Sequence, residues 1–335
     1  MKKKIALIYG GEGKEKGVSK RSAEALYSLI DREKYEVIPV FISECGGWFI
    51  AEHDPFGKMP TVMARPTYPT RLCGRSGLLS GKEIIEIDLA LPILHGDFGE
   101  DGTIQGALDS AHIGYIGSGT VASAVCVDKY LTKLVATSLG IPTAKGILLD
   151  GEPTEEALYI AEENIGYPMF IKPTSLGSSI GAARVDTKED FFSSYARARC
   201  YGRVLAEELL PIKHEIECAY FSDGEREIYS PYGIIETGGE TYDFDRKYRT
   251  ENTARVLDTL PECAEAVTEA ARRLCHAIGV RHIGRFDFIV TEKNELYFNE
   301  INTIPGMTRT SLYPELIKRA IGRDFIGALL DKVAL

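Results

Sequence analysis

Apolar and polar positions at the start of the chain follow a pattern that predicts a parallel α/β unit. An apolar run over residues 4–9 ends in a glycine-rich turn at residues 10–13. Apolar positions between residues 23 and 30 recur at helical spacing, and Ser19 is a good N-cap for a helix that begins there. A second apolar run covers residues 36–42. The order strand, turn, helix, strand is typical of parallel α/β folds.

A further strand is predicted over residues 87–94, because its nearly continuous apolar pattern is that of a strand buried on both faces. It ends in His95, which is followed by the loop Gly-Glu-Asp-Gly at residues 99–102 and a predicted helix. Ligands bind at the carboxyl ends of strands in open parallel sheets. The first glycine-rich turn and the His95 loop are therefore candidate ligand-binding segments.

The middle and last thirds of the chain predict antiparallel strands. Residues 169–173 and 182–186 flank a Gly/Ser-rich loop, as in a hairpin. In the last third, a helix is predicted over residues 261–278 and a hairpin over residues 284–302, which indicates an α+β region. Residues 236–254 are polar and predict a long loop, a kind of segment that often forms an enzyme lid.

The last hairpin carries the most informative chemistry. Because side chains alternate along strands, Arg285 and Asp287 share one face, and so do Glu300 and Asn302. A tight turn would place Asp287 opposite residues 298–299, so that Glu300 reaches the same patch. Two carboxylates and an amide oxygen are hard ligands that suit magnesium rather than zinc. A solvated polar strand face is the alternative interpretation.

Two loops could hold anions. Residues 303–308 form a bent segment whose backbone amides could bind an oxyanion. The loop at residues 177–181, which follows Lys172, consists mainly of small residues that let backbone N–H groups approach a phosphate, although an ordinary hairpin turn is equally compatible. There is no Walker A motif, and the first turn has Lys16 where a dinucleotide-binding fingerprint has its last glycine.

Composition narrows the function classes. A chain of 335 residues predicts two or three domains, and a net charge of −10 argues against nucleic acid as the main partner. No apolar run reaches the roughly 18 residues of a membrane helix, and the apolar stretch after the basic start is too short for a signal peptide. The seven cysteines form no Cys-x-x-Cys pair, which favours reduced thiols in the cytoplasm over disulfides or zinc.

A series of motifs in this order resembles the D-alanine–D-alanine ligases of the ATP-grasp superfamily, a family that includes the vancomycin-resistance-type D-alanine–D-serine ligases. The resemblance covers essentially the whole chain, and although each motif alone is modest, the ordered set is highly specific. In chain order the motifs are His95-Gly-x-x-Gly-Glu-Asp-Gly, Gly117-Ser-Gly, Asp128-Lys129, Lys172-Pro with Gly-Ser-Ser, Tyr242-Asp-x-x-x-Lys247-Tyr248, Gly284-Arg-x-Asp, and Asn299-Glu-Ile-Asn-Thr-x-Pro-Gly-Met-Thr.

This resemblance implies an ATP-grasp fold of mixed α/β and α+β class. It places an N-terminal α/β domain over residues 1–117, a central ATP-grasp subdomain with the Gly-Ser loop over 118–212, and a C-terminal subdomain with the magnesium site and the lid loop over 213–335. It also implies a cytoplasmic homodimer that uses ATP, D-alanine and two Mg²⁺ ions, for which Mn²⁺ could substitute.

The resemblance also assigns roles to individual residues. Glu15 would hold the ammonium of the first D-alanine, with Ser178 and Tyr248 locking the lid over it. Arg285 would polarise the acyl phosphate beside the Gly306 N–H. The metal ligands would be Asp287, Glu300 and Asn302. Other substrate-binding positions would be His95, Lys247, Ser311 and Leu312. The nucleotide would contact Lys129, Lys172, Ser179, Glu207 and Glu215, although the spacing of Glu215 is one residue longer than expected.

The implied reaction begins with attack of the first substrate's carboxylate on the γ-phosphate, which positioning and charge neutralisation promote. The amine of a second D-amino acid then attacks the acyl phosphate, and a closed lid keeps out water. The pair Lys247-Tyr248 favours a D-amino acid over D-lactate. D-Serine stays open as second substrate, because a hydrophobic pocket excludes one added hydroxyl only about a hundredfold. The sequence Gly117-Ser118-Gly119 looks more like the D-alanine enzymes.

Some positions depart from the family, and two other function classes stay in view. Residues 14–19 lack a second acidic residue that many relatives have, Thr310 stands where histidine is common, and the insert at 45–82 is long. An NAD-dependent oxidoreductase is opposed by the failed fingerprint and by the magnesium hairpin. A non-catalytic ATP-binding homologue is opposed by the four polar residues of that hairpin, which are all present. A protein without catalytic activity has no chemical reason to keep them.

Overall fold

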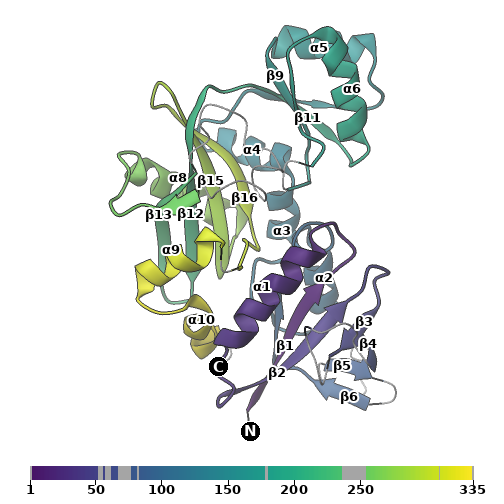
Figure 1. Cartoon of the computed structure of the whole chain (residues 1–335), viewed down its shortest axis with the longest axis vertical. Coiled ribbons are helices and arrows are strands. Elements are labelled where there is room, and N and C mark those ends of the chain that lie inside the picture. The colour runs from purple at the N-terminus through teal and green to yellow at the C-terminus, as the bar shows by residue number, and fades with distance from the viewer. Residues whose placement is uncertain are drawn as a thin grey trace.

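The N-terminal sheet combines a parallel core with an antiparallel extension. The computed structural model describes residues 2–51, 56, 62–66, 77–80, 83–177, 180–235, 254–308 and 310–333 (Figure 1). Within these residues the sheet has the order β6-β5-β4-β3-β2-β1-β7, with β1 parallel to both β2 and β7. Its strands are β1 (Lys3–Gly10), β2 (Tyr35–Ile42), β3 (Trp48–Ile50), β4 (Val62–Pro66), β5 (Gly77–Ser80), β6 (Glu83–Glu86) and β7 (Leu89–Pro92). The predicted parallel unit is confirmed.

The first helix begins earlier than the sequence predicts. Helix α1 (Lys16–Leu29) has Glu15 at its N-cap position, so the prediction of Ser19 as N-cap is wrong. The Ser19 side chain is fully buried, accepts a hydrogen bond from Gly10 N over 2.8 Å and donates to the carbonyl of Ile93. A tertiary role for the hydroxyl, holding the ends of β1 and β7 together, has replaced the capping role.

The central sheet is antiparallel and has the order β10-β9-β11-β8. The predicted hairpin is confirmed, because Ala183 pairs with Ile171 in antiparallel register. The elements are β8 (Gly146–Leu149), α5 (Glu155–Asn164), β9 (Met169–Pro173), β10 (Ala183–Val185), α6 (Lys188–Arg199) and β11 (Val204–Glu208). In Figure 1 this teal unit lies at the top of the molecule, with the N-terminal sheet at the bottom.

The C-terminal sheet has the order β14-β13-β12-β15-β16 within the described residues. Its elements are β12 (Ile212–Ser222), β13 (Glu227–Ile235), β14 (Ala254–Val256), α8 (Ala264–Ile278), β15 (Ile283–Thr291) and β16 (Leu296–Asn302). Two earlier helices, α3 (Thr120–Val127) and α4 (Lys129–Ser138), pack on this sheet, since Cys126 and Ala136 share a hydrophobic core with Leu274 and Phe286. The division of the chain at residues 117 and 212 stays a prediction.

The end of the chain joins the first and last sheets. The remaining helices are α2 (Thr103–Ser110), α9 (Leu312–Ile321) and α10 (Phe325–Val333). One hydrophobic core contains Leu26 of α1 together with Leu316 of α9 and Leu329 of α10. On the surface, Asp331 of α10 accepts hydrogen bonds from Lys34 over 3.0 Å and from Arg323 over 3.1 Å. Apolar and polar contacts thus fix the N-terminal sheet against the C-terminal half.

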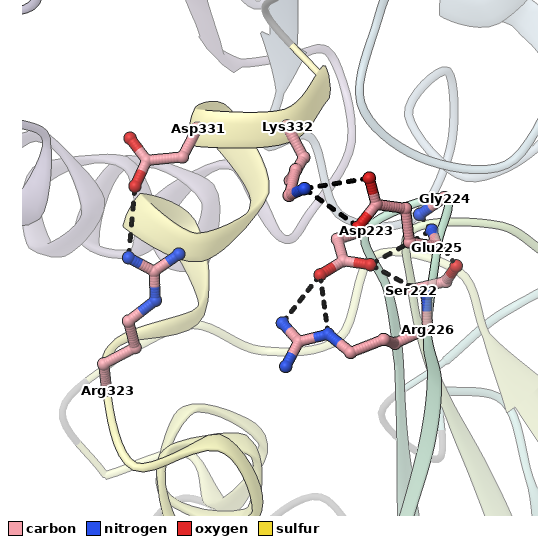
Figure 2. A network of polar contacts seen from close by, with 8 residues as sticks. All are labelled: Ser222, Asp223, Gly224, Glu225, Arg226, Arg323, Asp331 and Lys332. Atoms are coloured by element: carbon pink, nitrogen blue, oxygen red, sulfur yellow. Dashed lines mark hydrogen bonds and ion pairs between the residues drawn. The ribbon is translucent and has the colours of Figure 1, made fainter.

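The turn between β12 and β13 takes part in the same surface network (Figure 2). Lys332 of α10 donates to both carboxylate oxygens of Glu225 over 2.8 Å. Within the turn, Asp223 accepts two hydrogen bonds from the Arg226 guanidinium. Among the residues that the structure describes, every helix is too short or too polar to cross a membrane.

Candidate active site

The β15–β16 hairpin brings four polar side chains together, as the sequence predicts. Arg285 lies opposite Asn302, and Asp287 lies opposite Glu300. The expectation that Asp287 faces residues 298–299 is wrong, because the register shifts between Asp287 and the following residue. Such an irregularity adds a residue to one strand and re-aims the side chains beside it. Here the shift places the two carboxylates directly across from each other.

Both carboxylates of this patch are paired with a cation. The Arg285 guanidinium donates to both oxygens of Asp287, over 2.7 and 2.6 Å, and Asn302 Nδ2 donates to Asp287 Oδ2 over 3.0 Å. Lys129 Nζ lies 3.2 Å from Glu300 Oε2. The hard oxygen donors of this patch fit a Mg²⁺ ion. When bound, the ion would replace some of the ion pairs that the two carboxylates make with Arg285 and Lys129. The donor set therefore suits the predicted metal.

A cavity of about 130 Å³ lies between the central and C-terminal sheets, on one side of the hairpin. It is lined by predicted nucleotide-binding and metal-binding side chains from six elements. Those side chains are Lys129, Lys172, Glu207, Glu215, Asp287 and Glu300. The structure thus gathers at one cavity residues that are up to 171 positions apart, from 129 to 300.

The floor of this nucleotide pocket is a buried triad of charges. Glu207 Oε2 lies 2.6 Å from Lys172 Nζ, and Glu207 Oε1 lies 2.7 Å from Lys133 Nζ. Burial alone would raise the pKa of Glu207, but the two ammonium groups outweigh it and hold the pKa at about 2. Burial lowers the pKa of Lys133. Sequence reasoning missed Lys133, although its position four residues after Lys129 places both on one face of α4.

Lys129 also connects this pocket to the Gly-Ser loop. Its Nζ donates to the carbonyl of Leu176 over 2.8 Å, and its backbone N–H donates to the carbonyl of Thr174 over 2.8 Å. Gly177 then lines both this pocket and a second cavity. The lysine therefore holds the start of the loop beside Glu300.

The second cavity, of about 740 Å³, borders the same polar face of the hairpin and is also lined by residues from α1 and the His95 loop. It brings together the predicted amino-acid-binding residues that fall within the described part of the chain. They are Glu15, His95, Arg285, Gly306, Ser311 and Leu312. Glu300 and Asn302 line this cavity too. Because Glu300 also lines the nucleotide pocket, the polar hairpin face forms a wall that the two cavities share.

Two glycines let the backbone approach side chains that line this amino-acid cavity. A Cβ added at Gly96, which has a φ of +72°, would stand 2.6 Å from Oε2 of Glu15. A Cβ at Gly306 would stand 2.8 Å from Oγ of Ser311, whose hydroxyl also accepts from Thr308 N over 3.1 Å. The glycines at these positions therefore make room for the predicted substrate-binding side chains.

Two titratable groups in the cavity are held in unusual states. Burial lowers the pKa of His95 to about 4, so its imidazole is neutral at physiological pH. Burial raises the pKa of Glu100 to about 7, against the effect of hydrogen bonds from backbone N–H groups. Sequence reasoning did not single out Glu100, although it is the carboxylate of the Gly-Glu-Asp-Gly motif that follows His95.

Four predicted site residues lie outside the described residues, namely Ser178, Ser179, Lys247 and Tyr248. The same holds for residues 236–253 of the predicted lid loop. Ala254, which was included in that loop, begins β14 and lines the amino-acid cavity. The roles of these residues stay predictions.

Comparison with known families accounts for nearly the whole chain. Residues 4–118 match the family described as D-ala D-ala ligase N-terminus, and residues 135–331 match D-ala D-ala ligase C-terminus. The D-alanine--D-alanine ligase of Thermoanaerobacter sp. (strain X514) is 35% identical over 346 residues, covering 99% of this chain and 95% of that protein. The enzyme of the same name from Chlorobium limicola is 36% identical over 355 residues, covering 98% and 95%.

Solved structures agree in fold over the same length. The VanG D-Ala:D-Ser ligase from Enterococcus faecalis superposes with a TM-score of 0.86 at 31% identity, covering 99% of this chain and 98% of that one. The D-alanyl-alanine synthetase A from Vibrio cholerae has a TM-score of 0.84 at 26% identity, with the same coverage. The expected ATP-grasp architecture is confirmed by these matches.

Proposed function

The chain belongs to the D-alanine–D-alanine ligase family, and from this premise we propose that it joins two D-alanine molecules into D-alanyl-D-alanine for peptidoglycan precursors, with conversion of ATP to ADP and phosphate. One observation supports this most directly. A single polar hairpin face borders both the nucleotide pocket and the amino-acid cavity, with Glu300 lining both. A phosphoryl group can therefore pass from one compartment to the other at this face.

On the nucleotide side, the protein's contribution is charge. Lys129 and Lys172 are the predicted phosphate contacts, and both are held in place by carboxylates, Glu300 and Glu207 respectively. Asp287, Glu300 and Asn302 would hold magnesium, which when bound neutralises phosphate charge and orients the γ-phosphoryl group. Preorganised cations suit a phosphoryl transfer, in which positioning and electrostatics dominate.

On the amino-acid side, two substrates would share the cavity. Glu15 binds the ammonium of the first D-alanine, whose carboxylate then faces the hairpin and attacks the γ-phosphate. Arg285, which projects from β15 into the cavity, stabilises the resulting acyl phosphate. Ser311 and Leu312 at the start of α9 bind the carboxylate of the second D-alanine.

The second step is attack of the second substrate's amine on the acyl carbon. The carbonyl oxygen gains negative charge as the tetrahedral intermediate forms, and the Gly306 N–H and Arg285 stabilise that charge. Phosphate then leaves, and the lost ammonium proton passes to solvent or to a carboxylate of the cavity. A lid formed by the loop that carries Lys247 and Tyr248 would exclude water, which otherwise hydrolyses the acyl phosphate.

D-Serine as second substrate is the alternative, and one observation favours it. The VanG D-Ala:D-Ser ligase shares this fold at 31% identity over 99% of the chain. The 35–36% identity to enzymes named D-alanine--D-alanine ligase supports D-alanine. We further propose a homodimer in the cytoplasm, where ATP and thiols in reduced form are found; sedimentation of the full chain tests the dimer.

The deciding experiment is ADP release from ATP with D-alanine alone, with D-alanine plus D-serine, and with D-alanine plus D-lactate, each product being identified by mass. We expect strong release with D-alanine alone and a D-alanyl-D-alanine product. Release that needs D-serine would move the enzyme to the alternative class. No release with any pair would contradict the proposed function.

A further inference from the structure

The loop after β16 is held from two sides by the N-terminal domain. His95 Nδ1 lies 3.0 Å from the carbonyl oxygen of Ile304, and Oε1 of Glu100 accepts from the backbone N–H of Ile304 over 3.0 Å. Two residues further on is Gly306, whose amide faces the amino-acid cavity in the proposed mechanism. Both polar groups of the Ile304 backbone are thus engaged by side chains from the His95 loop.

A third side chain, from helix α1, completes the arrangement. Ser22 is fully buried, and its Oγ lies 3.0 Å from His95 Nε2 and accepts from the backbone N–H of Met307 over 3.4 Å. Glu100 in turn accepts from Gly96 N over 3.0 Å, which fixes its carboxylate within its own loop. Ser22, His95 and Glu100, here named the loop clasp, therefore hold both ends of residues 304–307.

The hydrogen bonds determine the imidazole tautomer. A carbonyl oxygen can only accept, so His95 must donate from Nδ1 to Ile304. A neutral imidazole then has an acceptor at Nε2, and the Ser22 hydroxyl must donate to it. This leaves the lone pairs of Ser22 Oγ to accept from Met307 N. Each member of the clasp has one consistent role, and His95 has no nitrogen left for acid–base chemistry.

We propose that Ser22 and Glu100 are positioning residues for the acyl-transfer step: through the clasp they fix the Gly306 amide where the oxyanion of the tetrahedral intermediate forms. The inference rests on the proposed function. An N–H donor stabilises such an oxyanion only if it is held at hydrogen-bonding distance from the place where charge develops. A shift of about 1 Å in a positioned group can cost about a hundredfold in rate.

The clasp also couples the N-terminal domain to the chemistry without touching the nucleotide. None of its contacts involves Lys129, Lys172 or Glu207. Loosening the clasp should therefore slow attack of the second amine and leave ATP binding and phosphoryl transfer close to normal. This split between steps separates a positioning role from a general loss of stability.

The chain offers a matched control on the same helix. Ser19 and Ser22 are both fully buried in α1 and both make hydrogen bonds to other segments, but those of Ser19 go to Gly10 and Ile93 inside the N-terminal sheet. Ser19→Ala and Ser22→Ala should lower the denaturation midpoint by similar amounts, because each leaves buried polar groups unpaired. Only Ser22→Ala should slow acyl transfer.

Rapid-quench single turnovers with ATP and D-alanine measure both steps, ADP formation and dipeptide formation. For Ser22→Ala we expect ADP to form within threefold of the wild-type rate and dipeptide to form about 10–100-fold more slowly. Affinity for a phosphinate analogue of the tetrahedral intermediate should fall by a similar factor. Glu100→Gln, which keeps one acceptor oxygen, should show the same pattern with a smaller loss, and Glu100→Ala a larger one.

Three outcomes would overturn the inference: wild-type dipeptide rates in both Ser22→Ala and Glu100→Gln, equal slowing of ADP and dipeptide formation, or equal slowing in the Ser19→Ala control. If Ser22→Ala does not fold, the Glu100 series decides alone. Failure of the proposed function is distinguishable, because the wild-type enzyme would then form no dipeptide.

Discussion

The nucleotide pocket and the amino-acid cavity share one wall but hold their titratable groups in opposite ways. In the nucleotide pocket, Glu207 is buried between Lys133 and Lys172, and its pKa is about 2, so the carboxylate stays charged. In the amino-acid cavity, burial lowers the pKa of His95 to about 4 and raises that of Glu100 to about 7. The buried carboxylate of the nucleotide pocket is thus kept charged, whereas burial disfavours the charged forms of His95 and Glu100.

This difference matches what each compartment has to do. Phosphates carry charge throughout the reaction, so fixed ammonium groups held by a carboxylate serve them from the start. In the amino-acid cavity, charge develops on the carbonyl oxygen only during the reaction. Groups whose ionisation is suppressed can fix a backbone amide without adding a full charge, and the proposed mechanism leaves the substrate's own charges to Glu15 and Arg285.

The largest expected effect comes from the wall that the two compartments share. Asp287→Ala should reduce turnover by at least about 10³-fold, because it removes a proposed metal ligand and the partner of Arg285. Steady-state ADP release measures this loss. Asp223→Ala is the matched control, because Asp223 is also buried and also holds an arginine through two hydrogen bonds, but at the turn shown in Figure 2, in contact with neither cavity. Near-wild-type turnover in Asp287→Ala would rule out the metal assignment.

The charged pocket can be tested at Glu207. Glu207→Gln should raise the KM for ATP by about 10–100-fold, because two lysines lose the charge that positions them. It should also lower the free energy of unfolding at pH 7 by on the order of 3 kcal/mol, as expected when a buried ion pair loses one partner. Substrate saturation curves and chemical denaturation give the two quantities.

The pH dependence of this loss has a definite sign. The folded pKa of Glu207, about 2, lies below its ordinary value of 4.5, so its stabilisation is complete above pH 4.5 and disappears as the pH falls toward 2. The stability difference between wild type and Glu207→Gln should therefore shrink across that window. A difference that stays constant from pH 7 to pH 3 would contradict the charged state of the pocket.

The same comparison shows what the sequence could and could not predict. Patterns that act over a few residues, such as the alternation of apolar and polar side chains and short motifs, predicted three features. They are the parallel unit, the hairpin that contains Met169–Pro173, and the polar patch at Asp287. The resemblance to the ligases supplied the overall fold. The sequence did not reveal the Lys133–Glu207 pair or the loop clasp, because both depend on packing between segments that are distant in the chain.

Two predictions are wrong for identifiable physical reasons. Ser19 has the chemistry of an N-cap, but tertiary hydrogen bonds to Gly10 and Ile93 use its hydroxyl, so the helix begins at Lys16. The register of the hairpin shifts beside Asp287, an irregularity that strand alternation cannot show. In both places tertiary structure overrides a correct local preference.

The raised pKa of Glu100 in the amino-acid cavity predicts that its effect on stability changes with pH in the direction opposite to that of Glu207. The folded pKa of Glu100, about 7, lies above its ordinary value of 4.5, because burial and nearby Glu15 outweigh two backbone N–H donors and Arg285. The folded state then binds more protons than the unfolded state between these values, so Glu100 lowers stability as the pH rises from 4.5 through 7. Glu100→Gln should remove this slope.

Denaturation of wild type and Glu100→Gln at pH 5 and pH 8 measures this effect. The variant should gain on the order of 1–2 kcal/mol relative to wild type between the two pH values. Other titrating groups are common to both proteins and cancel in the difference. A stability difference between the two proteins that is the same at pH 5 and pH 8 would show that Glu100 is ionised at both pH values. The proposed contrast between Glu100 and Glu207 would then be wrong.

The smallest expected effect concerns a contact between the loop before α1 and the residues that follow α6. Lys14, next to Glu15 in the first turn, donates to the Tyr201 hydroxyl over 3.1 Å and lies 4.4 Å from the centre of its ring. Tyr201 follows α6, so this contact joins the loop that carries Glu15 to the unit that carries the Gly-Ser loop. An exposed cation–π contact contributes about 0.5–1 kcal/mol. Lys14→Met should therefore raise the KM for the first D-alanine about two- to fivefold.

Two further variants separate the parts of this contact. Tyr201→Phe keeps the ring and should lose less than Tyr201→Ala, and neither should add to Lys14→Met in the double variant, because the two side chains act as one unit. Arg32→Met is the control, since Arg32 lies 3.9 Å from the centre of the Tyr27 ring at the far end of α1. Initial rates at low D-alanine concentration give the comparison. Additive losses in the double variant would mean that Lys14 acts through Glu15 rather than through its contact with Tyr201.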